Sequence, residues 1–383
     1  MRRSRTRMAG TALALLAVVG LAACSTGAEG GAEQDAPPVA KVSASVEAKA
    51  KDVPVREPIT IQAKQGELTE AKLTNEQGKE VEGELAADKA SWTSSEPLGY
   101  GTTYEYTAKA KGNDGKAVPL EGSFSTIEPS SVVRATLNPT DDQTVGVAMP
   151  ISVKFEQPIE DKAAAEKALT VETSNDVEGS WAWLHDQQVD WRPKEYWPEH
   201  TKVNVSAKLY GVNYGGGAYG KTDVTTKFEI GRNQVVKINT PDHEMKVFED
   251  GNQVTSYPAS NGKDADPNLN TPNGTFIVMA KEEVGNFSNP QYGYTDVMKK
   301  WAVRFSNHGE FIHENEENAA NIGVANTSHG CVNLFEADAN EYFHGALIGD
   351  PVEVTGSQTT MEAKYEVYDW LIPWEQWQTM SEL

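Results

Sequence analysis

The chain runs IHENEENAANIGVANTSHGCVN from Ile312 to Asn333. It holds one of the two cysteines, Cys331, eighteen residues after His313. A thiol attacks as its thiolate, so it needs a nearby base and donors for the oxyanion that its attack creates. His313 is the candidate base, Cys331 the candidate nucleophile, and the backbone amides around His329, Gly330 and Cys331 are the candidate donors.

The spacing of this histidine and cysteine, with SHGCVN around the thiol, resembles the motif of the L,D-transpeptidases with a YkuD-like catalytic domain. The segments TPNGTFIV at 271–278 and YTDV at 294–297 are similar to the same family. The end YDWLIPWEQW at 368–377 resembles the C-terminal segment of actinobacterial members that carry Ig-like modules. The resemblance covers about 235–377 closely, and it implies a β-rich catalytic fold, with a mixed sheet curled around the motif.

The resemblance also implies roles for single residues. The third member of the catalytic group is the backbone carbonyl of the residue after the base, which is Glu314 here, where a small or hydroxylated residue is commoner. Tyr294 would add its hydroxyl to the oxyanion donors, although one inserted residue before His313 makes Tyr292 its substitute. The other site residues are Ser328, His329, Gly330 and Asn333; for Ser328 and Asn333, a role as simple turn residues is the alternative.

Peptidoglycan stem peptides are the substrates that the resemblance implies. Cys331 would attack the third residue of a donor tetrapeptide, D-alanine would leave, and the amine of a neighbouring stem would take the acyl group to give a 3→3 cross-link. Carbapenem β-lactams would acylate the same thiol, and no cofactor is implied. A carboxypeptidase with water as acceptor, an enzyme that attaches proteins to peptidoglycan, and a non-catalytic wall-binding lipoprotein are the alternatives.

Two other interpretations of the motif use different chemistry. His313, His329 and Cys331 are all residue types that bind zinc, but the paired spacing of two to four residues that is typical of zinc ligands is missing. His313 follows Phe311 and Ile312, so it is also interpretable as a core histidine on a strand.

The N-terminus has the order of an export signal, with four arginines in residues 1–7 followed by an apolar run that is short for a membrane span. The sequence LAAC before Ser25 matches a bacterial lipoprotein processing site, which predicts a signal peptide at 1–23 and a lipidated Cys24. The alternative is an ordinary signal peptide. Lipidation would place the protein on the outer face of the cell membrane, toward the cell wall, and would leave Cys331 as a lone, reactive thiol.

The composition is acidic and is typical of a globular protein. Lys and Arg number 34 against 56 Asp and Glu, which gives a formal net charge of −22. Such a surface argues against nucleic acid as the main partner. We expect a monomer.

The rest of the chain predicts a mainly β protein. A flexible tether at 24–40 precedes two Ig-like β-sandwich modules, at 41–129 and 130–231, in which short alternating runs are separated by turns. Trp92 and Trp191 occupy equivalent places at an offset of 99 residues, which indicates an internal duplication. The catalytic domain is predicted at 232–355 and a Trp-rich segment, folded back as a clamp, at 356–383. Helices are expected at 161–169 and 336–347.

Two features of the second module have alternative interpretations. Trp181, Trp183 and Trp191 are expected in the core of the sandwich, with a carbohydrate-stacking platform as the alternative. The glycine-rich loop NYGGGAYG at 213–220 lacks the lysine and the helix of a phosphate-binding loop, so we expect it to face a neighbouring domain.

Overall fold

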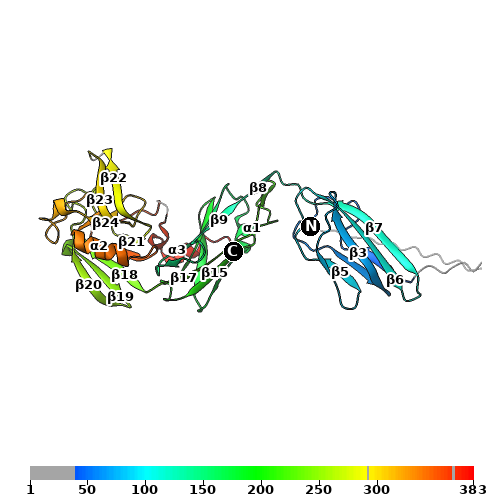
Figure 1. The fold of residues 1–383 in the computed structure, drawn as a ribbon. Coiled ribbons are helices and arrows are strands. Elements are labelled where there is room, and N and C mark those ends of the chain that lie inside the picture. Colours follow the sequence, from blue (N-terminus) through cyan, green and yellow to red (C-terminus); the bar gives the residue numbers. More distant parts are fainter. Residues whose placement is uncertain (1–38, 291–292, 365–366) are drawn as a thin grey trace, which may run out of the picture.

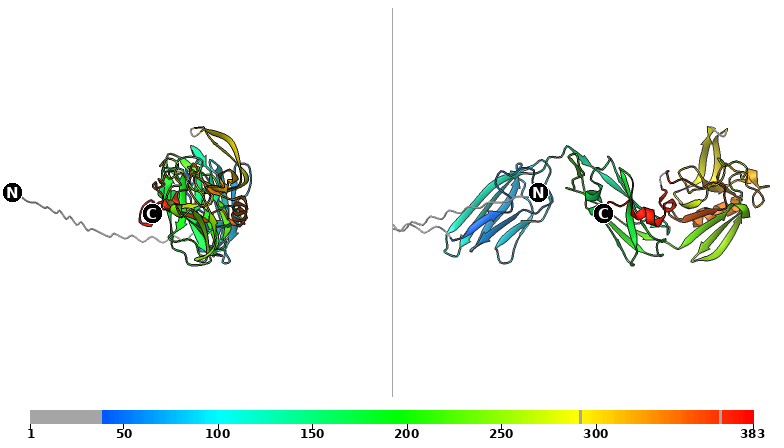
Figure 2. Two further views of the ribbon diagram at one scale, coloured as in Figure 1. Left: turned by 90° about the vertical axis from the view of Figure 1, so that its left-hand side faces the viewer. Right: turned by 180° about the vertical axis from the view of Figure 1, so that it is seen from behind.

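The computed structural model describes residues 39–290, 293–364 and 367–383, and three β-rich units follow one another along a row (Figure 1). The views in Figure 2 show the same row from its end and from behind. The predicted signal peptide, Cys24 and most of the predicted tether lie outside the described residues. Within the described ranges, every helix is too short or too polar to cross a lipid bilayer.

The first unit packs two antiparallel sheets face to face. One sheet has the strand order β1-β2-β5-β4 and the other β3-β6-β7. Buried and exposed residues alternate along the whole of β6, as the period-2 pattern of TYEYTAKAKG requires. The strands are β1 (Lys41–Ala44), β2 (Thr60–Lys64), β3 (Gly66–Asn75), β4 (Gly83–Leu85), β5 (Ser91–Ser94), β6 (Thr103–Gly112) and β7 (Ala117–Ser125).

The second unit repeats this plan with sheets of order β13-β14-β11-β9 and β10-β17-β15-β12. A two-stranded sheet of β8 and β16 lies beside them, and the helix α1 begins after Asp161, whose Oδ1 accepts a hydrogen bond from the Ala164 amide at 2.9 Å. The elements are β8 (Ser131–Val133), β9 (Ala135–Asn138), β10 (Thr144–Val145), β11 (Ile151–Phe155), α1 (Lys162–Lys167), β12 (Leu169–Thr173), β13 (Gly179–His185), β14 (Gln188–Pro193), β15 (Lys202–Ala207), β16 (Ala218–Gly220) and β17 (Val224–Ile230).

The two tryptophans that suggested a duplication occupy the same place in their sheets. Trp92 on β5 lies against Gly83 of the neighbouring strand, and Trp191 on β14 lies against Gly179 in the same way. In each pair the glycine faces the residue two positions after the tryptophan across the ladder. A side chain at either glycine would collide with an indole ring. The structure therefore agrees with duplication of one sandwich plan.

The tryptophans of the second unit are core residues. Trp183 and Trp191 are buried, and Trp181 is half-buried against the same core. The ring of Trp183 stacks on Phe155 at 5.8 Å, and its indole N–H donates to Glu166 Oε2 at 3.0 Å. This burial supports the core interpretation over the carbohydrate-stacking platform.

The third unit contains a five-stranded sheet of order β20-β19-β18-β26-β21 and a four-stranded sheet of order β22-β23-β24-β25. Their apolar faces and the helix α2 share one core. The elements are β18 (Gln234–Asn239), η1 (Thr240–Asp242), β19 (Glu244–Glu249), β20 (Asn252–Pro258), β21 (Gly274–Ile277), β22 (Ala280–Asn289), β23 (Tyr294–Arg304), β24 (Phe311–Glu314), η3 (Glu316–Asn318), β25 (Val332–Leu334), α2 (Glu336–Gly345) and β26 (Pro351–Thr355).

The second unit is joined to both of its neighbours. Toward the first unit, the Tyr100 hydroxyl donates to the Gly220 carbonyl at 2.7 Å and accepts from the Gly211 amide at 2.7 Å. The glycine-rich loop at 213–220 therefore does face a neighbouring unit. Toward the third unit, the amides of Gly146 and Ala148 donate to the carbonyls of Ile348 and Gly349.

The C-terminal segment folds back onto the second unit, as predicted (Figure 1). Its elements are η4 (Asp369–Leu371) and α3 (Trp374–Gln378). Trp377 is fully buried, and its indole N–H donates to the Ser180 carbonyl at 2.9 Å. The tail thus connects the end of the third unit to β13 of the second.

Candidate active site

Two short parallel strands bring the candidate base and the thiol segment together. On the ladder between β24 and β25, Ile312 faces Val332 and His313 faces Asn333. Cys331 precedes β25 by one residue. Residues that are eighteen apart in the chain therefore become neighbours on the sheet.

The His313 imidazole is buried and oriented by its own strand. Its Nδ1 lies 2.6 Å from the carbonyl oxygen of Glu314, so Nδ1 carries the proton and donates it to this oxygen. Its Nε2 accepts from Asn333 Nδ2 at 3.3 Å. The ring also packs against Phe287 at 5.0 Å between centroids. The carbonyl of Glu314 thus fixes both the tautomer and the direction of the ring.

The Glu314 side chain points elsewhere. Its carboxylate accepts hydrogen bonds from the backbone amides of Lys300 at 3.1 Å and Glu316 at 3.3 Å. The unusual side chain at this position therefore leaves the carbonyl that faces His313 unobstructed.

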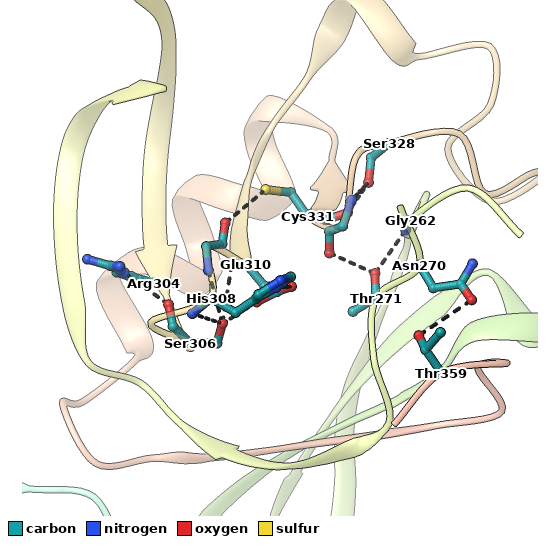
Figure 3. Close-up of polar contacts among 12 residues, drawn as sticks. Gly262, Asn270, Thr271, Arg304, Ser306, His308, Glu310, Ser328, Cys331 and Thr359 are labelled. Carbon is teal, nitrogen blue, oxygen red and sulfur yellow. Dashed lines mark hydrogen bonds and ion pairs between the residues drawn. The ribbon is translucent and has the colours of Figure 1, made fainter. Parts of the chain in front are cut away.

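The Cys331 thiol faces the turn before β24. Sγ lies 3.9 Å from the Gly309 carbonyl (Figure 3). In the described part of the chain no hydrogen bond joins Sγ to His313, whose Nε2 is engaged by Asn333.

Burial keeps both groups neutral in this arrangement. It lowers the pKa of His313 to about 4, and the positive charge of Lys299 lowers it further, while the hydrogen bond to Glu314 opposes this change. Burial raises the pKa of the Cys331 thiol to about 12. At neutral pH the resting site therefore contains a thiol and a neutral imidazole, which favours proton transfer during attack over a preformed ion pair.

The loop before the thiol has a conformation that only glycine adopts readily. Gly330 has φ = +119°, a region that disfavours residues with a Cβ. Its carbonyl accepts from the Thr271 hydroxyl at 2.8 Å, and this buried hydroxyl accepts in turn from the Gly262 amide at 2.8 Å (Figure 3). Thr271 thereby ties the TPNG segment to the loop of the thiol.

Ser328 acts as a clip within the same loop. Its Oγ donates to the Cys331 carbonyl at 2.5 Å and accepts from the Gly330 amide at 3.2 Å. The structure thus gives Ser328 a loop-fixing position. One predicted oxyanion donor, the Gly330 amide, is occupied by Ser328 in this state.

A cavity of about 320 Å³ lies over these residues. The predicted site residues that line it are Tyr294, His313, Ser328, His329, Cys331 and Asn333. The rings of His329 and Tyr294 lie 5.4 Å apart, on the side formed by the hairpin of β22 and β23. Gly330 is not among the lining residues, and Tyr292, the predicted substitute for Tyr294, lies outside the described residues.

Several lining residues were not predicted from the sequence. Asn333 Oδ1 accepts from Asn315 Nδ2 at 2.9 Å and from Asn318 Nδ2 at 3.2 Å, which holds the Asn333 amide toward His313. Lys299 and Glu317 form an ion pair of 3.1 Å at the cavity wall. The alternation of β23 could have placed Lys299 on the face of Val297, but the motif itself gave no signal for it.

The zinc interpretation requires three side chains to converge. His313 faces Asn333, His329 packs on Tyr294, and Cys331 faces Gly309. Across residues 39–290, 293–364 and 367–383, no group of three or more His, Cys, Asp or Glu side chains is arranged to hold a metal ion. The three side chains of the zinc interpretation are therefore not brought together among these described residues.

Comparison with known families assigns both parts of the chain. A family model described as an L,D-transpeptidase catalytic domain matches residues 233–354, which include the cavity and its histidine and cysteine. A model described as a bacterial Ig domain matches residues 50–213, which span parts of both N-terminal units.

Individual relatives match over most of the chain. L,D-transpeptidase 5 of Mycobacterium tuberculosis is 43% identical over 385 residues, which cover 98% of this chain and 85% of the relative. L,D-transpeptidase 2 of the same species is 35% identical over 396 residues, with 98% and 96% covered. The solved structure of the LD transpeptidase LdtMt1 in complex with imipenem has 31% identity and a TM-score of 0.50, and covers 59% of this chain and 99% of that one.

Proposed function

The chain belongs to the L,D-transpeptidase family, and from this premise we propose that it cross-links peptidoglycan stem peptides through a thioester on Cys331. The family makes it an enzyme of the acyltransferase class. The choice of nucleophile, the 3→3 linkage and the acceptor are the parts that we propose.

In the first step the thiol rotates from Gly309 toward His313, and Asn333 releases Nε2. Sγ attacks the carbonyl of the third residue of a donor tetrapeptide, and Nε2 takes the thiol proton. The Glu314 carbonyl stabilises the imidazolium through Nδ1. The oxyanion is held by the Cys331 amide, by the Gly330 amide once Ser328 releases it, and by the Tyr294 hydroxyl. The C–N bond to D-alanine then breaks, and His313 gives its proton to the leaving amine.

In the second step the side-chain amine of a neighbouring stem attacks the thioester. His313 takes a proton from this amine, the C–S bond breaks, and the thiol recovers the proton. A cavity that excludes water favours an amine over hydrolysis. The products are a 3→3 cross-linked dimer, free D-alanine and the original enzyme.

One observation carries this proposal: His313 Nδ1 lies 2.6 Å from the Glu314 carbonyl, while His313 and Cys331 line the same cavity. The intact mass of the protein after incubation with a carbapenem, or with a disaccharide-tetrapeptide, tests it. We expect a covalent adduct on the wild type and none on Cys331→Ala. Cys24→Ala serves as the matched control and should keep the adduct.

The products separate the remaining alternatives. A tetrapeptide-derived dimer that lacks one D-alanine supports a transpeptidase, whereas a tripeptide alone supports the carboxypeptidase. Absence of any adduct from the wild type would contradict the proposed nucleophile. The imipenem complex of the relative LdtMt1 makes a carbapenem the natural first probe.

The proposal extends to location. We infer that the mature chain is a monomer lipidated at Cys24 and held on the outer face of the membrane, which would place the catalytic unit toward the wall. Metabolic labelling with a palmitate analogue should mark the wild type and leave Cys24→Ala unlabelled. Labelling of both proteins alike would refute the assignment.

A further inference from the structure

A buried cation lies at the wall of the catalytic cavity. Lys299 is 8% exposed and lines the cavity together with Val297, two residues earlier on β23. Residues at i and i+2 of a strand share a face, which agrees with both side chains lining the cavity. Lys300, the next residue, points to the opposite face and pairs with Glu336 at 2.7 Å. A buried lysine at a substrate cavity calls for a specific role, because burial of an ammonium is costly unless acceptors surround it.

The acceptors of Lys299 leave room for a ligand. Nζ donates to Asn315 Oδ1 at 2.8 Å and to Glu317 Oε2 at 3.1 Å. These are its acceptors among the described residues, and an ammonium has three N–H donors. The Glu317 side chain is 88% exposed, so its carboxylate reaches Lys299 from solvent. An exposed partner contributes little to an ion pair, so a carboxylate of a bound ligand can replace it.

Lys299 is also connected to the candidate base. Asn315 accepts from Lys299 through Oδ1 and donates to Asn333 Oδ1 at 2.9 Å, and Asn333 in turn donates to His313 Nε2. A ligand that contacts Lys299 would therefore lie beside the reacting groups. Among the described residues that line the cavity, Lys299 is the one Lys or Arg side chain.

We propose that Lys299 recognises a carboxylate of the donor stem peptide, and that Glu317 occupies this position in the free protein. The inference rests on the proposed function, because a donor tetrapeptide ends in the free carboxylate of its terminal D-alanine. A diaminodicarboxylic acid at the third position offers a second carboxylate. Both sources present the same chemistry to Lys299, and a carboxamide lacks the negative charge.

The experiment compares donors that differ only in charge. The full chain is assayed for kcat and KM with a disaccharide-tetrapeptide, with its terminal carboxamide, and with a side-chain carboxamide at the third residue. The variants are Lys299→Met, Lys299→Arg, Glu317→Gln and the matched control Lys300→Met. The donor whose amidation cancels the effect of Lys299→Met identifies the carboxylate that binds.

We expect Lys299→Met to raise KM for the acid about tenfold to a hundredfold and to leave KM for the relevant amide nearly unchanged, because a charged hydrogen bond is lost. Lys299→Arg should restore part of the preference. Glu317→Gln should lower KM for the acid roughly twofold to fivefold, since the competing carboxylate is gone. Lys300→Met should behave as the wild type.

A purely structural Lys299 would give a different result. Lys299→Met would then reduce activity equally on acids and amides, and Glu317→Gln would not lower KM; either outcome overturns the inference. If Lys299→Met does not fold, as judged from its thermal melt, the acid-to-amide ratio of Glu317→Gln decides. A wild type that acylates neither donor would instead refute the proposed function, and the inference with it.

Discussion

His313, in the cavity wall, is neutral. A histidine that forms an ion pair with a cysteine thiolate would instead be positively charged. The ring of His313 is enclosed by Phe287 and by the strand of Asn333, so the charged form lacks water. The Glu314 carbonyl favours the charged form, but burial outweighs it. A neutral ring can accept a proton, as the proposed attack by the Cys331 thiol requires.

This state predicts the pH dependence of acylation. With the pKa of His313 lowered to about 4, kcat/KM should be constant from about pH 5 to 8 and should halve near pH 4. The measurement is the rate of carbapenem adduct formation against pH. An acid limb near the ordinary histidine pKa of about 6.5 would contradict the neutral, buried state.

Folding must be monitored in the same experiment. A lowered histidine pKa means that the unfolded chain binds more protons between about pH 4 and 6.5. The contribution of His313 to stability is therefore complete above that window and is lost as the pH falls through it. Circular dichroism at each pH separates loss of the base from loss of the fold.

At the level of elements, the thiol loop depends on a contact with a distant segment. Thr271 lies before β21, is fully buried, and uses its single hydroxyl for both Gly262 and Gly330. This tie holds the carbonyl of Gly330, a residue with φ = +119°, next to Cys331.

Replacement of Thr271 by valine should loosen the loop while the volume is conserved. It leaves a buried amide and a buried carbonyl without partners, at a cost of about 1–3 kcal/mol. We expect a lower melting temperature and a slower acylation of Cys331. Thr359→Val is the matched control, because its hydroxyl makes only a 3.5 Å contact with Asn270 (Figure 3). Equal effects of the two variants would argue against the tie.

At the level of the whole molecule, the C-terminal segment closes over buried charges of the second unit. The Arg192 guanidinium lies among the rings of Trp370, Trp374 and Trp377, at 4.5–5.2 Å from their centroids. Beside it Asp190 and Asp369 are both buried. Burial raises the pKa of Asp369 to about 6, and burial together with the Asp369 charge raises the pKa of Asp190.

The clamp should therefore be strongest in mild acid. A carboxyl with a raised pKa binds more protons in the folded state, so its contribution is complete below about pH 4 and is lost as the pH rises through about 6. Asp369→Asn should raise the melting temperature at pH 8 and change it less at pH 4.5. Asp186→Asn, on the surface beside Lys162, is the control and should change little at either pH. No gain from Asp369→Asn at pH 8 would refute the assignment.

The two Ig-like units are expected to space the catalytic unit from the membrane, and this leads to a prediction about cross-linking in cells. They are joined by Tyr100 and by Arg56, whose guanidinium binds Asp223 at 3.0 Å, so they form a connected stalk. Deletion of residues 41–129 should preserve acylation on soluble stem peptides and should reduce 3→3 cross-links in cells. Muropeptide analysis measures the cross-links, and an unchanged level would exclude a spacing role for the first unit.

Much of this protein is encoded in local sequence. Alternating runs predicted the mainly β fold, and Trp92 and Trp191 pointed to the repeated plan. The motif allowed His313, Glu314 and Cys331 to be chosen as a group. The alternation of the strands and the spacing of His313 and Cys331 are properties of short segments, which a single sequence displays directly, whereas the role of Glu314 came from the family resemblance.

Other properties exist only in the folded chain. The neutral state of His313, the contact of the thiol with Gly309, and the approach of Lys299 to Asn315 and Glu317 required β23, β24 and the thiol loop to meet. The C-terminal tryptophans likewise pack on the guanidinium of Arg192, which is far from them in the chain. Burial and long-range contacts shift pKa values and determine which side chains interact, and neither can be seen from a residue's neighbours in the sequence. The sequence determined which chemical groups are available. The tertiary structure decided which of these groups meet and which of them are charged.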